Sequence, residues 1–546
     1  MAPSLRPWIV LPIGVLVACG DDGRPADAAS DSQTATMTTP TAASATDTPP
    51  TGGDDASGTG TDGSNSNSNA TPDTSSEPTV ASAETSATSV ATGDTTATDD
   101  TGFTPGCDRE PPTGYMTAFD QACANMPEVG MFNPVVEWHK GSWTTGPGSR
   151  SSASAPIVAQ LTDDDADGKI TPDDMPEVLT VTYADPNNPN PVYIRAVSGD
   201  GATEVLNIQN AQFTRNQTLT AADIDSDGIV EIVTKATDQK VYAYEHDGAL
   251  KWTSAALGDH TGVYDSAVSV SDMNGDGNPE LVTGRAILDN KGVLIAAGTH
   301  GIGKPAGNAN ASASMSFAVD VNADGEQEVV VGDALYNIAG ADLWFNGLPD
   351  GFPATIDLEA DGAAEIVVVY NANVRVQRGS DGSVVWDVAV PGGLGGPPTV
   401  ADFDGDGLPE VGIAGQGKYS VFDTDGAVLW SNTTQDASSG ITGSSVYDFE
   451  GDGVADVVYA DEINLYVYSG VDGAEKLKFA DHNSGTRLEM PVVADVDDDG
   501  EVEIVFVSES YGGQFGPIDG ITVIGDADHS WRPGRKLWNQ HAYHIT

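Results

Sequence analysis

Residues 402–410 of this chain are D-F-D-G-D-G-L-P-E. Three Asp residues stand at alternate positions, a Gly stands at position 6, and a Glu closes the stretch at position 9. The pattern D-x-[D/N/E]-x-D-G occurs eight times, and its copies begin at Asp163, Asp223, Asp272, Asp320, Asp357, Asp402, Asp448 and Asp495. Asp and Gly are common in this chain, so one copy carries little information. Eight copies, each followed by an apolar run, indicate a structural repeat.

The spacing of the copies indicates the architecture. Successive copies are separated by 60, 49, 48, 37, 45, 46 and 47 residues. Between them, short β-branched and aromatic runs alternate with Asp-Gly turns, which predicts antiparallel strands. Four strands in about 45 residues fit one blade of a propeller. We therefore predict an all-β fold, a β-propeller of four-stranded antiparallel blades, with eight blades favoured and seven as the alternative.

Two details bear on how the ring is completed. The 37-residue interval from Asp320 to Asp357 allows a truncated blade, which would leave seven. Residues 135–138, V-V-E-W, resemble the fourth strand of a blade such as V-L-W at 428–430. We expect residues 135–138 to close the ring by pairing with the last blade. The tryptophans that end the fourth strands are expected to pack between blades rather than to form a ligand cage.

The loops carry the chemistry of a hard cation. Oxygen atoms at positions 1, 3 and 5 converge when the chain turns sharply, and Gly at position 6 permits that turn because it has no Cβ. The carbonyl of position 7 and the carboxylate of position 9 complete the shell. Oxygen donors without Cys or His favour Ca²⁺ over zinc or copper. Without a cation, neighbouring carboxylates repel at about 4 kcal/mol per close pair. The alternative is a set of solvated Asp/Gly turns.

The predicted ligands differ in quality among the copies. Three copies are rich in carboxylates: Asp223, Asp225, Asp227, Ile229 and Glu231; Asp402, Asp404, Asp406, Leu408 and Glu410; Asp495, Asp497, Asp499, Glu501 and Glu503. Two have Asn at position 3: Asp272, Asn274, Asp276, Asn278 and Glu280; Asp320, Asn322, Asp324, Glu326 and Glu328. Two have a longer Glu there, which loosens the expected cage: Asp357, Glu359, Asp361, Ala363 and Glu365; Asp448, Glu450, Asp452, Val454 and Asp456. The first has EF-hand spacing: Asp163, Asp165, Asp167, Lys169, Thr171 and Asp174.

The N-terminal part predicts export. Residues 8–17 form an apolar stretch that is too short to span a membrane. It leads into L-V-A-C at 16–19, which resembles a bacterial lipobox. The resemblance implies that residues 1–18 are a lipoprotein signal peptide and that Cys19 is lipidated at the outer membrane or cell surface. The alternative is an ordinary secretory signal, and either one takes the chain out of the cytoplasm.

The rest of the chain divides by composition. Residues 19–106 are rich in Thr, Ser, Ala and Asp, and they predict a disordered linker that tethers the folded part. Residues 107–150 form a small segment in which Cys107 and Cys123 are expected to pair as a disulfide. Residues 151–530 hold the propeller, and 531–546 form a tail with Trp, Arg and His. The formal net charge of −59 makes nucleic acid an unsuitable partner.

Two segments carry a resemblance to a known family. Residues 400–411, V-A-D-F-D-G-D-G-L-P-E-V, and 493–504, V-A-D-V-D-D-D-G-E-V-E-I, resemble FG-GAP/VCBS repeats, the calcium-loop blades of integrin-type β-propellers. The resemblance covers about 150–540 and implies that the loop residues above bind Ca²⁺ between the first two strands of each blade. With the lipobox and the linker, the chain also resembles surface lipoproteins of myxobacteria.

Three functions remain open. A binding or adhesion module with a protein or glycan ligand is favoured, because the chain shows none of the common catalytic motifs. A propeller enzyme acting on polysaccharide would draw on His260, His300, Lys304, Arg535, His541 and His544. A structural subunit of an envelope assembly is the third. Long loops mark the expected working face at 183–191, 297–312 and 509–518; residues 297–312 are the preferred contact surface, with a flexible spacer as the alternative.

Overall fold

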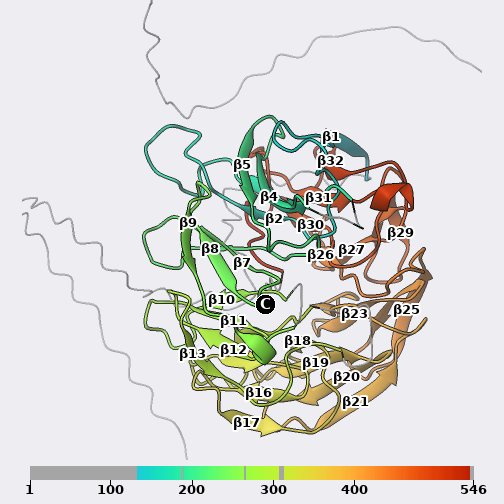
Figure 1. Cartoon of the computed structure of the whole chain (residues 1–546). Helices are drawn as coiled ribbons and strands as arrows, with labels where there is room; N and C mark the ends of the chain where they lie inside the picture. Colours follow the sequence, from blue (N-terminus) through green and yellow to red (C-terminus); the bar gives the residue numbers. More distant parts are fainter. Residues whose placement is uncertain (1–131, 186, 188–189, 263–265, 306–312, 542–546) are drawn as a thin grey trace, which may run out of the picture. The chain divides into compact units, whose positions relative to one another are not determined.

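The computed structural model describes residues 132–185, 187, 190–262, 266–305 and 313–541. These residues form eight four-stranded antiparallel sheets that stand as blades around a ring (Figure 1). The predicted all-β propeller and its eight blades are confirmed. No helix in these ranges is long and apolar enough to cross a membrane.

The strands nearest the ring axis are short. The inner strands of blades 1 to 8 are β2 (Ile157–Ala159), β6 (Thr220–Ala222), β10 (Ser269–Ser271), β14 (Phe317–Val319), β18 (Phe352–Ile356), β22 (Thr399–Ala401), β26 (Ser445–Tyr447) and β30 (Val492–Ala494). The second strands are β3 (Glu177–Thr182), β7 (Glu231–Lys235), β11 (Glu280–Thr283), β15 (Glu328–Val330), β19 (Glu365–Tyr370), β23 (Glu410–Gly415), β27 (Asp456–Ala460) and β31 (Glu503–Ser508).

The remaining strands complete the blades. The third strands are β4 (Tyr193–Ser198), β8 (Val241–Tyr244), β12 (Ala286–Leu288), β16 (Ala334–Tyr336), β20 (Asn373–Arg378), β24 (Lys418–Phe422), β28 (Leu465–Tyr468) and β32 (Gly520–Asp526). The outer strands are β5 (Glu204–Gln209), β9 (Leu250–Thr253), β13 (Leu294–Ala297), β17 (Asp342–Phe345), β21 (Val384–Ala389), β25 (Val428–Thr433), β29 (Glu475–Phe479) and β1 (Pro134–Lys140). Two short 3₁₀ turns are η1 (Gly258–His260) and η2 (Tyr511–Gly513).

The first strand of the chain closes the ring. β1 pairs antiparallel with β32, from Pro134 opposite Asp526 to Lys140 opposite Ile521, and so supplies the outer strand of blade 8. This is the role expected for residues 135–138. Blade 4, which holds the 37-residue interval, is complete; three of its strands have three residues and the fourth has four. The interval is short because only six residues, 346–351, connect β17 to β18 of blade 5.

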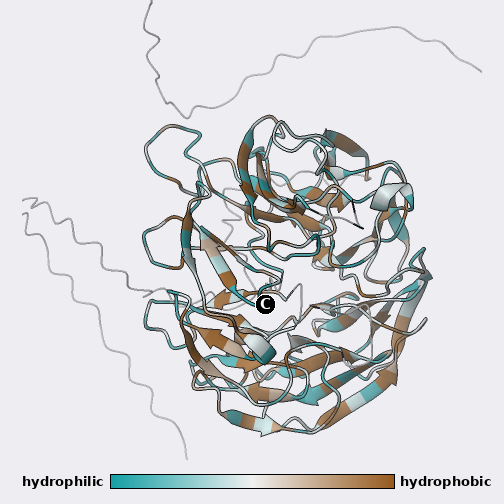
Figure 2. Ribbon diagram, viewed as in Figure 1, coloured by the Kyte–Doolittle hydropathy of each residue, from teal (hydrophilic) through white to brown (hydrophobic). Residues whose placement is uncertain are grey.

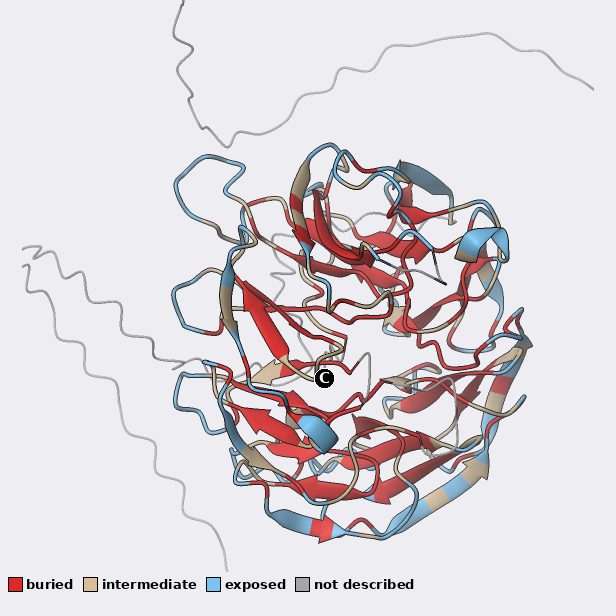
Figure 3. Cartoon of the chain, in the orientation of Figure 1, coloured by how far each residue is buried: buried red, intermediate tan, exposed pale blue. Residues whose placement is uncertain are grey.

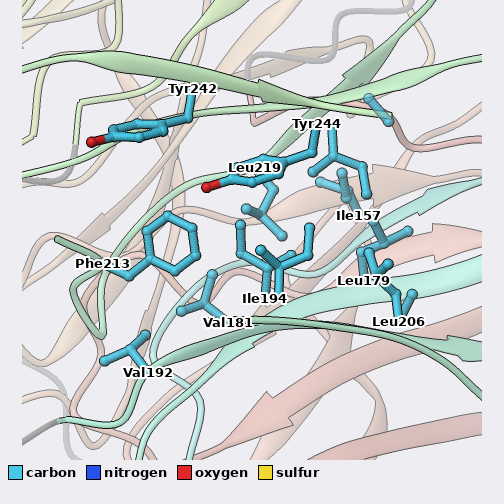
Figure 4. Packing of buried hydrophobic residues seen from close by; sticks show 14 of the residues in the cluster. Ile157, Leu179, Val181, Val192, Ile194, Leu206, Phe213, Leu219, Tyr242 and Tyr244 are labelled. Atoms are coloured by element: carbon cyan, nitrogen blue, oxygen red, sulfur yellow. The ribbon is translucent and has the colours of Figure 1, made fainter. Parts of the chain in front are cut away.

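Burial is most complete in the second strands of the blades and least in the outer strands (Figure 3). All six residues of β3 are buried, whereas none of the six residues of β21 is. Hydrophobic residues recur along the strands of the blades (Figure 2). Their side chains form clusters between neighbouring blades. The cluster in Figure 4 joins blade 1 and blade 2, with Leu179 and Ile194 on one side and Leu219, Tyr242 and Tyr244 on the other. Burial of this apolar surface holds adjacent blades together.

Outer-strand tryptophans link five of the eight blades to the next. The Trp430 indole N–H donates to the Gly470 carbonyl at 2.5 Å, and a Cβ added to Gly473 would stand 2.6 Å from the Trp430 ring. Trp138 has the same relation to Gly199 and Gly201. Each turn glycine has a positive φ, so it accepts both the backbone conformation and the close ring. The prediction that these tryptophans pack between blades is confirmed.

The C-terminal stretch crosses several blades. Trp531 is buried against Phe449 of blade 7, with ring centroids 4.8 Å apart. Trp538 forms an antiparallel bridge with Val158 in β2, and Gln540 forms another with Thr220 in β6. The predicted tail is therefore part of the folded body as far as residue 541 and lies along the inner strands of blades 1 and 2.

Some predicted features lie outside the described residues. They are the signal peptide, the linker, the lipidation site Cys19, the pair Cys107 and Cys123, residues 306–312 of the proposed contact surface, and His544. These features stay predictions.

Candidate metal-binding loops

The eight acidic loops occupy equivalent places in the blades. Each connects the inner strand to the second strand. In seven blades position 1 directly follows the inner strand, as Asp223 follows β6, and position 9 begins the second strand, as Glu231 begins β7. Antiparallel connections alternate between the two ends of a sheet, so all eight loops lie at the same end of the ring. The sequence repeat thus becomes a circle of carboxylates.

The first Asp of each loop holds the turn. In seven copies one of its carboxylate oxygens accepts the N–H of the position-6 glycine at 2.8–3.0 Å. That glycine has a φ between +83° and +91° in all eight copies. In all eight copies the position-5 Asp accepts the N–H of position 7. The backbone therefore fixes these side chains before any ion binds.

Four loops bring three carboxylates together. Their oxygen atoms lie within 4.8 Å of one another in the triads Asp163, Asp165 and Asp174; Asp223, Asp225 and Glu231; Asp402, Asp404 and Glu410; Asp495, Asp497 and Glu503. A fifth group joins Asp499 and Glu501 to His529, whose Nδ1 is 3.4 Å from a Glu501 oxygen. The first four triads are drawn from predicted ligands. Together with the carbonyl of position 7, they offer the oxygen-only environment that Ca²⁺ prefers.

The blade 6 loop contains a buried carboxylate oxygen that has no hydrogen-bond partner among the described residues. Glu410 is fully buried, and its Oε2 accepts the Phe403 N–H at 2.7 Å. Its Oε1 is buried without a hydrogen-bond partner in the described part of the chain. Burial first, and then the charges of Asp404 and Asp402, raise the pKa of Glu410 to about 7. A buried carboxylate oxygen without a partner is costly, and a cation held between Asp402, Asp404 and Glu410 would satisfy it.

Blade 8 concentrates still more negative charge. Burial, followed by Glu137, Asp497 and Asp495, raises the pKa of Glu503 to about 11. Glu137 lies in β1, and burial together with Asp497, Asp499 and Glu501 raises its pKa to about 7. The sequence analysis did not single out Glu137, because it is more than 350 residues away from this loop in the sequence. The sequence signal that could have found Glu137 is its position within residues 135–138, which were expected to pair with the last blade.

Three other loops contain a cation from the protein itself. In blade 2 the Lys251 ammonium lies 2.5 Å from Asp225 and 2.9 Å from Glu231. In blade 7 the Lys476 ammonium lies 2.7 Å from both Glu450 and Asp456. In blade 5 Arg378 lies 3.8 Å from Glu359 and from Glu365. The two loops with Glu at position 3 therefore hold ion pairs, and neither brings three carboxylates together.

The two Asn-containing loops keep the same backbone turn. Asn274 Oδ1 accepts the Asp276 N–H at 2.9 Å. Asn322 Nδ2 instead donates to a Glu328 oxygen at 3.1 Å. The Nδ2 contact of Asn322 leaves its Oδ1 available, and the role of both Asn residues as ligands stays a prediction.

The first loop differs from the others in register. The Asp174 carboxylate stabilises the turn, because it accepts hydrogen bonds from the N–H groups of Thr171 and Asp164. Glu177 begins β3 and accepts the Leu161 N–H at 2.6 Å, which is the role of the position-9 Glu in other blades. The sequence analysis did not include Glu177. The EF-hand-like loop, 163–174, is therefore an insertion ahead of the usual closing glutamate.

Two of the residues suggested for catalysis, His260 and His300, are bridged by Arg285, which donates hydrogen bonds to both of their carbonyls. His300 stacks on Phe345 at 3.5 Å and pairs with Asp342 at 3.1 Å, all at the edge of blade 4. The carbonyl of Arg535 accepts the Asp495 N–H in blade 8. Neighbouring Lys536 pairs with Asp498 in the same blade. His300 and Arg535 therefore lie at separate blades.

A small pocket lies at the other end of the ring. It has a volume of about 160 Å³ and is lined by Ser438, Ser439, Gly485, Arg487, Glu509, Tyr511, Gln514 and Phe515. These residues come from connections that lead into the inner strands of blades 7 and 8, and from the predicted long loop 509–518. Glu509 is buried and accepts hydrogen bonds from the Tyr183 hydroxyl and from the Gly485 N–H. The Arg215 guanidinium lies 4.8 Å from the centre of the Tyr511 ring.

Comparison with known proteins agrees with this architecture. Residues 223–283, 357–413 and 402–459 match the family model of the FG-GAP-like repeat. Each matched stretch begins at the first Asp of a loop. A search of the curated proteins found no match. The chain is therefore a β-propeller with FG-GAP-like repeats.

Two solved structures share the fold. The Vibrio cholerae biofilm matrix protein Bap1 is 21% identical, with a TM-score of 0.65, over 76% of this chain and 94% of that chain. The Bacillus licheniformis rhamnogalacturonan lyase PL11 is 18% identical, with a TM-score of 0.50, over 76% of this chain and 78% of that chain. At these identities the similarity concerns the fold alone.

Proposed function

We propose that this chain is a calcium-stabilised binding module, exported and held at the cell surface by lipid on Cys19. The observation that carries the calcium part is the buried, unpartnered Oε1 of Glu410 beside Asp402 and Asp404. In this proposal Asp402, Asp404, Glu410 and the carbonyl of Leu408 hold the ion. The corresponding residues of blades 1 and 8 hold two more.

Calcium fits these loops better than magnesium does. Ca²⁺ accepts six to eight oxygen ligands in an irregular shell, whereas Mg²⁺ requires a near-ideal octahedron and retains water. The carboxylates of the loops already accept hydrogen bonds from backbone N–H groups, as Asp402 does from the N–H of Gly407. The bound ion would neutralise like charges at the end of the ring and so strengthen each inner hairpin. It supplies charge compensation and needs no redox role.

The proposed ligand surface is the pocket end of the ring. The pocket combines the cation of Arg487 with the aromatic side chains of Tyr511 and Phe515 and with the hydroxyls of Ser438 and Ser439. Its volume of about 160 Å³ is below the range of roughly 300–1,000 Å³ usual for small-molecule sites. It therefore suits one residue or end group of a longer ligand, such as an acidic glycan, better than a free cofactor.

Binding is tested with the full chain and a panel of immobilised polysaccharides. Substitution of Arg487 and Tyr511 by Ala should weaken capture of an acidic glycan at least tenfold, which corresponds to about 1.4 kcal/mol. Lys291→Ala, in an exposed turn of blade 3, serves as the charge control. Equal binding by the pocket variant would refute this ligand surface, and the calcium loops would remain to be judged separately.

A polysaccharide lyase is the second candidate. Arg487 and Tyr511 at one pocket provide a cation for a uronate carboxylate and a hydroxyl for proton transfer. One of the two solved structures compared above is a rhamnogalacturonan lyase, although a shared fold does not define a function. Acidic polysaccharides incubated with the protein would yield an unsaturated uronide that absorbs ultraviolet light. Its formation would favour the enzyme, and its absence at high protein concentration would favour binding alone.

The anchor is a separate part of the proposal. Mass spectrometry of the protein from membranes should find the mature chain beginning at Cys19 with attached acyl groups. A chain that is cut elsewhere and carries no lipid would remove the anchor and leave the propeller unaffected.

A further inference from the structure

Every outer strand contains one extra residue opposite its neighbour. The register between the third and outer strands shifts once in each blade. The unpaired residues, which we call the bulge residues, are Val205, Lys251, Ile295, Leu343, Val385, Leu429, Lys476 and Glu137 in blades 1 to 8. Such β-bulges re-aim a side chain at a defined place.

The bulge places two lysines in the acidic loops. Lys251 reaches Asp225 and Glu231 in its own blade, and Lys476 reaches Glu450 and Asp456 in its own blade. These carboxylates are positions 3 and 9 of the two loops. Both lysine side chains are largely shielded, with 16% and 23% exposed. The ammonium group thus contacts the oxygens that a bound metal would use.

The other bulge residues provide the contrast. Blade 6 has Leu429, an apolar side chain that brings no charge to the loop, and Glu410 Oε1 is without a hydrogen-bond partner among the described residues. In blade 7 Lys476 contacts one oxygen each of Glu450 and Asp456, and the second oxygen of each is likewise unpartnered among the described residues. Blade 8 has Glu137, which adds an acidic group beside Asp497 and Asp499. The loops of blades 2 and 6 have the same Asp-Asp-Glu triad, so the loop sequence alone does not distinguish them.

We propose that the bulge residue decides which cation each acidic loop holds. The ammonium groups of Lys251 and Lys476 are permanent internal counterions, and they exclude Ca²⁺ from blades 2 and 7. Among the loops without a bulge lysine, those of blades 1, 6 and 8, which each bring three carboxylates together, take Ca²⁺. A divalent ion entering blade 2 would have to displace Lys251 from both Asp225 and Glu231, because two cations at that separation repel strongly. This inference rests on the proposed calcium binding.

The test is a count of Ca²⁺ bound per full chain, by equilibrium dialysis with radioactive Ca²⁺. The double variant Lys251→Met and Lys476→Met keeps the aliphatic stem and removes the charge. It should bind about two more ions than the wild type, one for each freed loop. The reverse variant, Leu429→Lys, should lose about one ion or weaken that site at least tenfold. Lys291→Met, an exposed lysine outside the loops, should leave the count unchanged.

The melting temperature is a second measurement, which detects any loss of stability in the double variant. Without metal, Glu231 and Asp456 lose their counterions, so the melting temperature should fall in EGTA and recover in Ca²⁺. An unchanged count in either the double variant or Leu429→Lys, while the wild type binds Ca²⁺, overturns the bulge rule alone. A wild type that binds no Ca²⁺ overturns both this inference and the proposed calcium binding.

Discussion

The residue that organises each loop is the acid at the start of the second strand. In blade 6, Glu410 accepts a backbone N–H with one oxygen and presents the other toward Asp402 and Asp404. The sequence predicts this role, because ligand type and spacing can be seen within nine residues. It does not predict Lys251, which is 20 residues from Glu231 and reaches it only through strand pairing. Nor does it predict Glu177, which lies 16 residues from its hydrogen-bond partner Leu161, nine more than the seven between the corresponding residues of other blades.

The first prediction concerns Glu410→Gln. In Ca²⁺ the variant should bind the blade 6 ion at least about tenfold more weakly, because one ligand charge is lost. In EGTA it should be as stable as the wild type or more stable, since an unpaired buried charge has been removed. Calorimetric titration and urea unfolding measure the two effects. Glu475→Gln, on an exposed part of β29, should change neither; equal losses in both media would contradict a metal-ligand role.

The second prediction is a pH dependence that changes sign with Ca²⁺. Burial raises the pKa of Glu410 and of Glu177 to about 7, above the 4.5 of an unperturbed Glu. Without metal, the folded chain therefore retains protons that the unfolded chain has released between about pH 4.5 and 7. Stability should fall as pH rises through that window. In saturating Ca²⁺ the carboxylates are ionised, so stability should instead fall as pH is lowered. Urea midpoints at several pH values would show whether the two trends oppose.

At the scale of elements, the outer strand does more than complete a sheet. In five blades its tryptophan packs against the next blade, and in blades 2 and 7 its bulge lysine contacts the acidic loop of its own blade. The sequence predicts the tryptophan contacts because Trp recurs just after an Asp-Gly turn, as at Trp386 and Trp430. The bulges are less accessible to sequence analysis, because a one-residue change of register leaves the alternating pattern almost intact.

The third prediction concerns Trp430→Ala. Trp430 is 7% exposed and contacts Gly470 and Gly473 of blade 7. Its removal leaves a cavity between two blades and should lower the free energy of unfolding by about 3–5 kcal/mol. Urea unfolding with Ca²⁺ present measures this loss. Val428→Ala, two residues away and 45% exposed, should cost less than about 1 kcal/mol. Similar costs for the two variants would show that the tryptophan does not join the blades.

At the scale of the whole molecule, the ring depends on both ends of the described chain. β1 completes blade 8, and the stretch 531–541 bridges inner strands of blades 1 and 2. The number of blades and the closing strand could be predicted, because each blade repeats one loop and one strand pattern. The path of the C-terminal stretch could not be, since its residues depart from the repeat and its contacts are with Val158 and Thr220, more than 300 residues earlier.

The most direct test of the account is thermal unfolding of the full chain in EGTA and in millimolar Ca²⁺, with Mg²⁺ as the control. Three occupied loops at about a hundred times their dissociation constants would each add roughly 2.7 kcal/mol, so the melting temperature should rise by about 10 °C or more in Ca²⁺. Mg²⁺ should produce little of that rise. Equal melting temperatures in EGTA and Ca²⁺ would contradict the account and would make the circle of carboxylates a set of solvated turns.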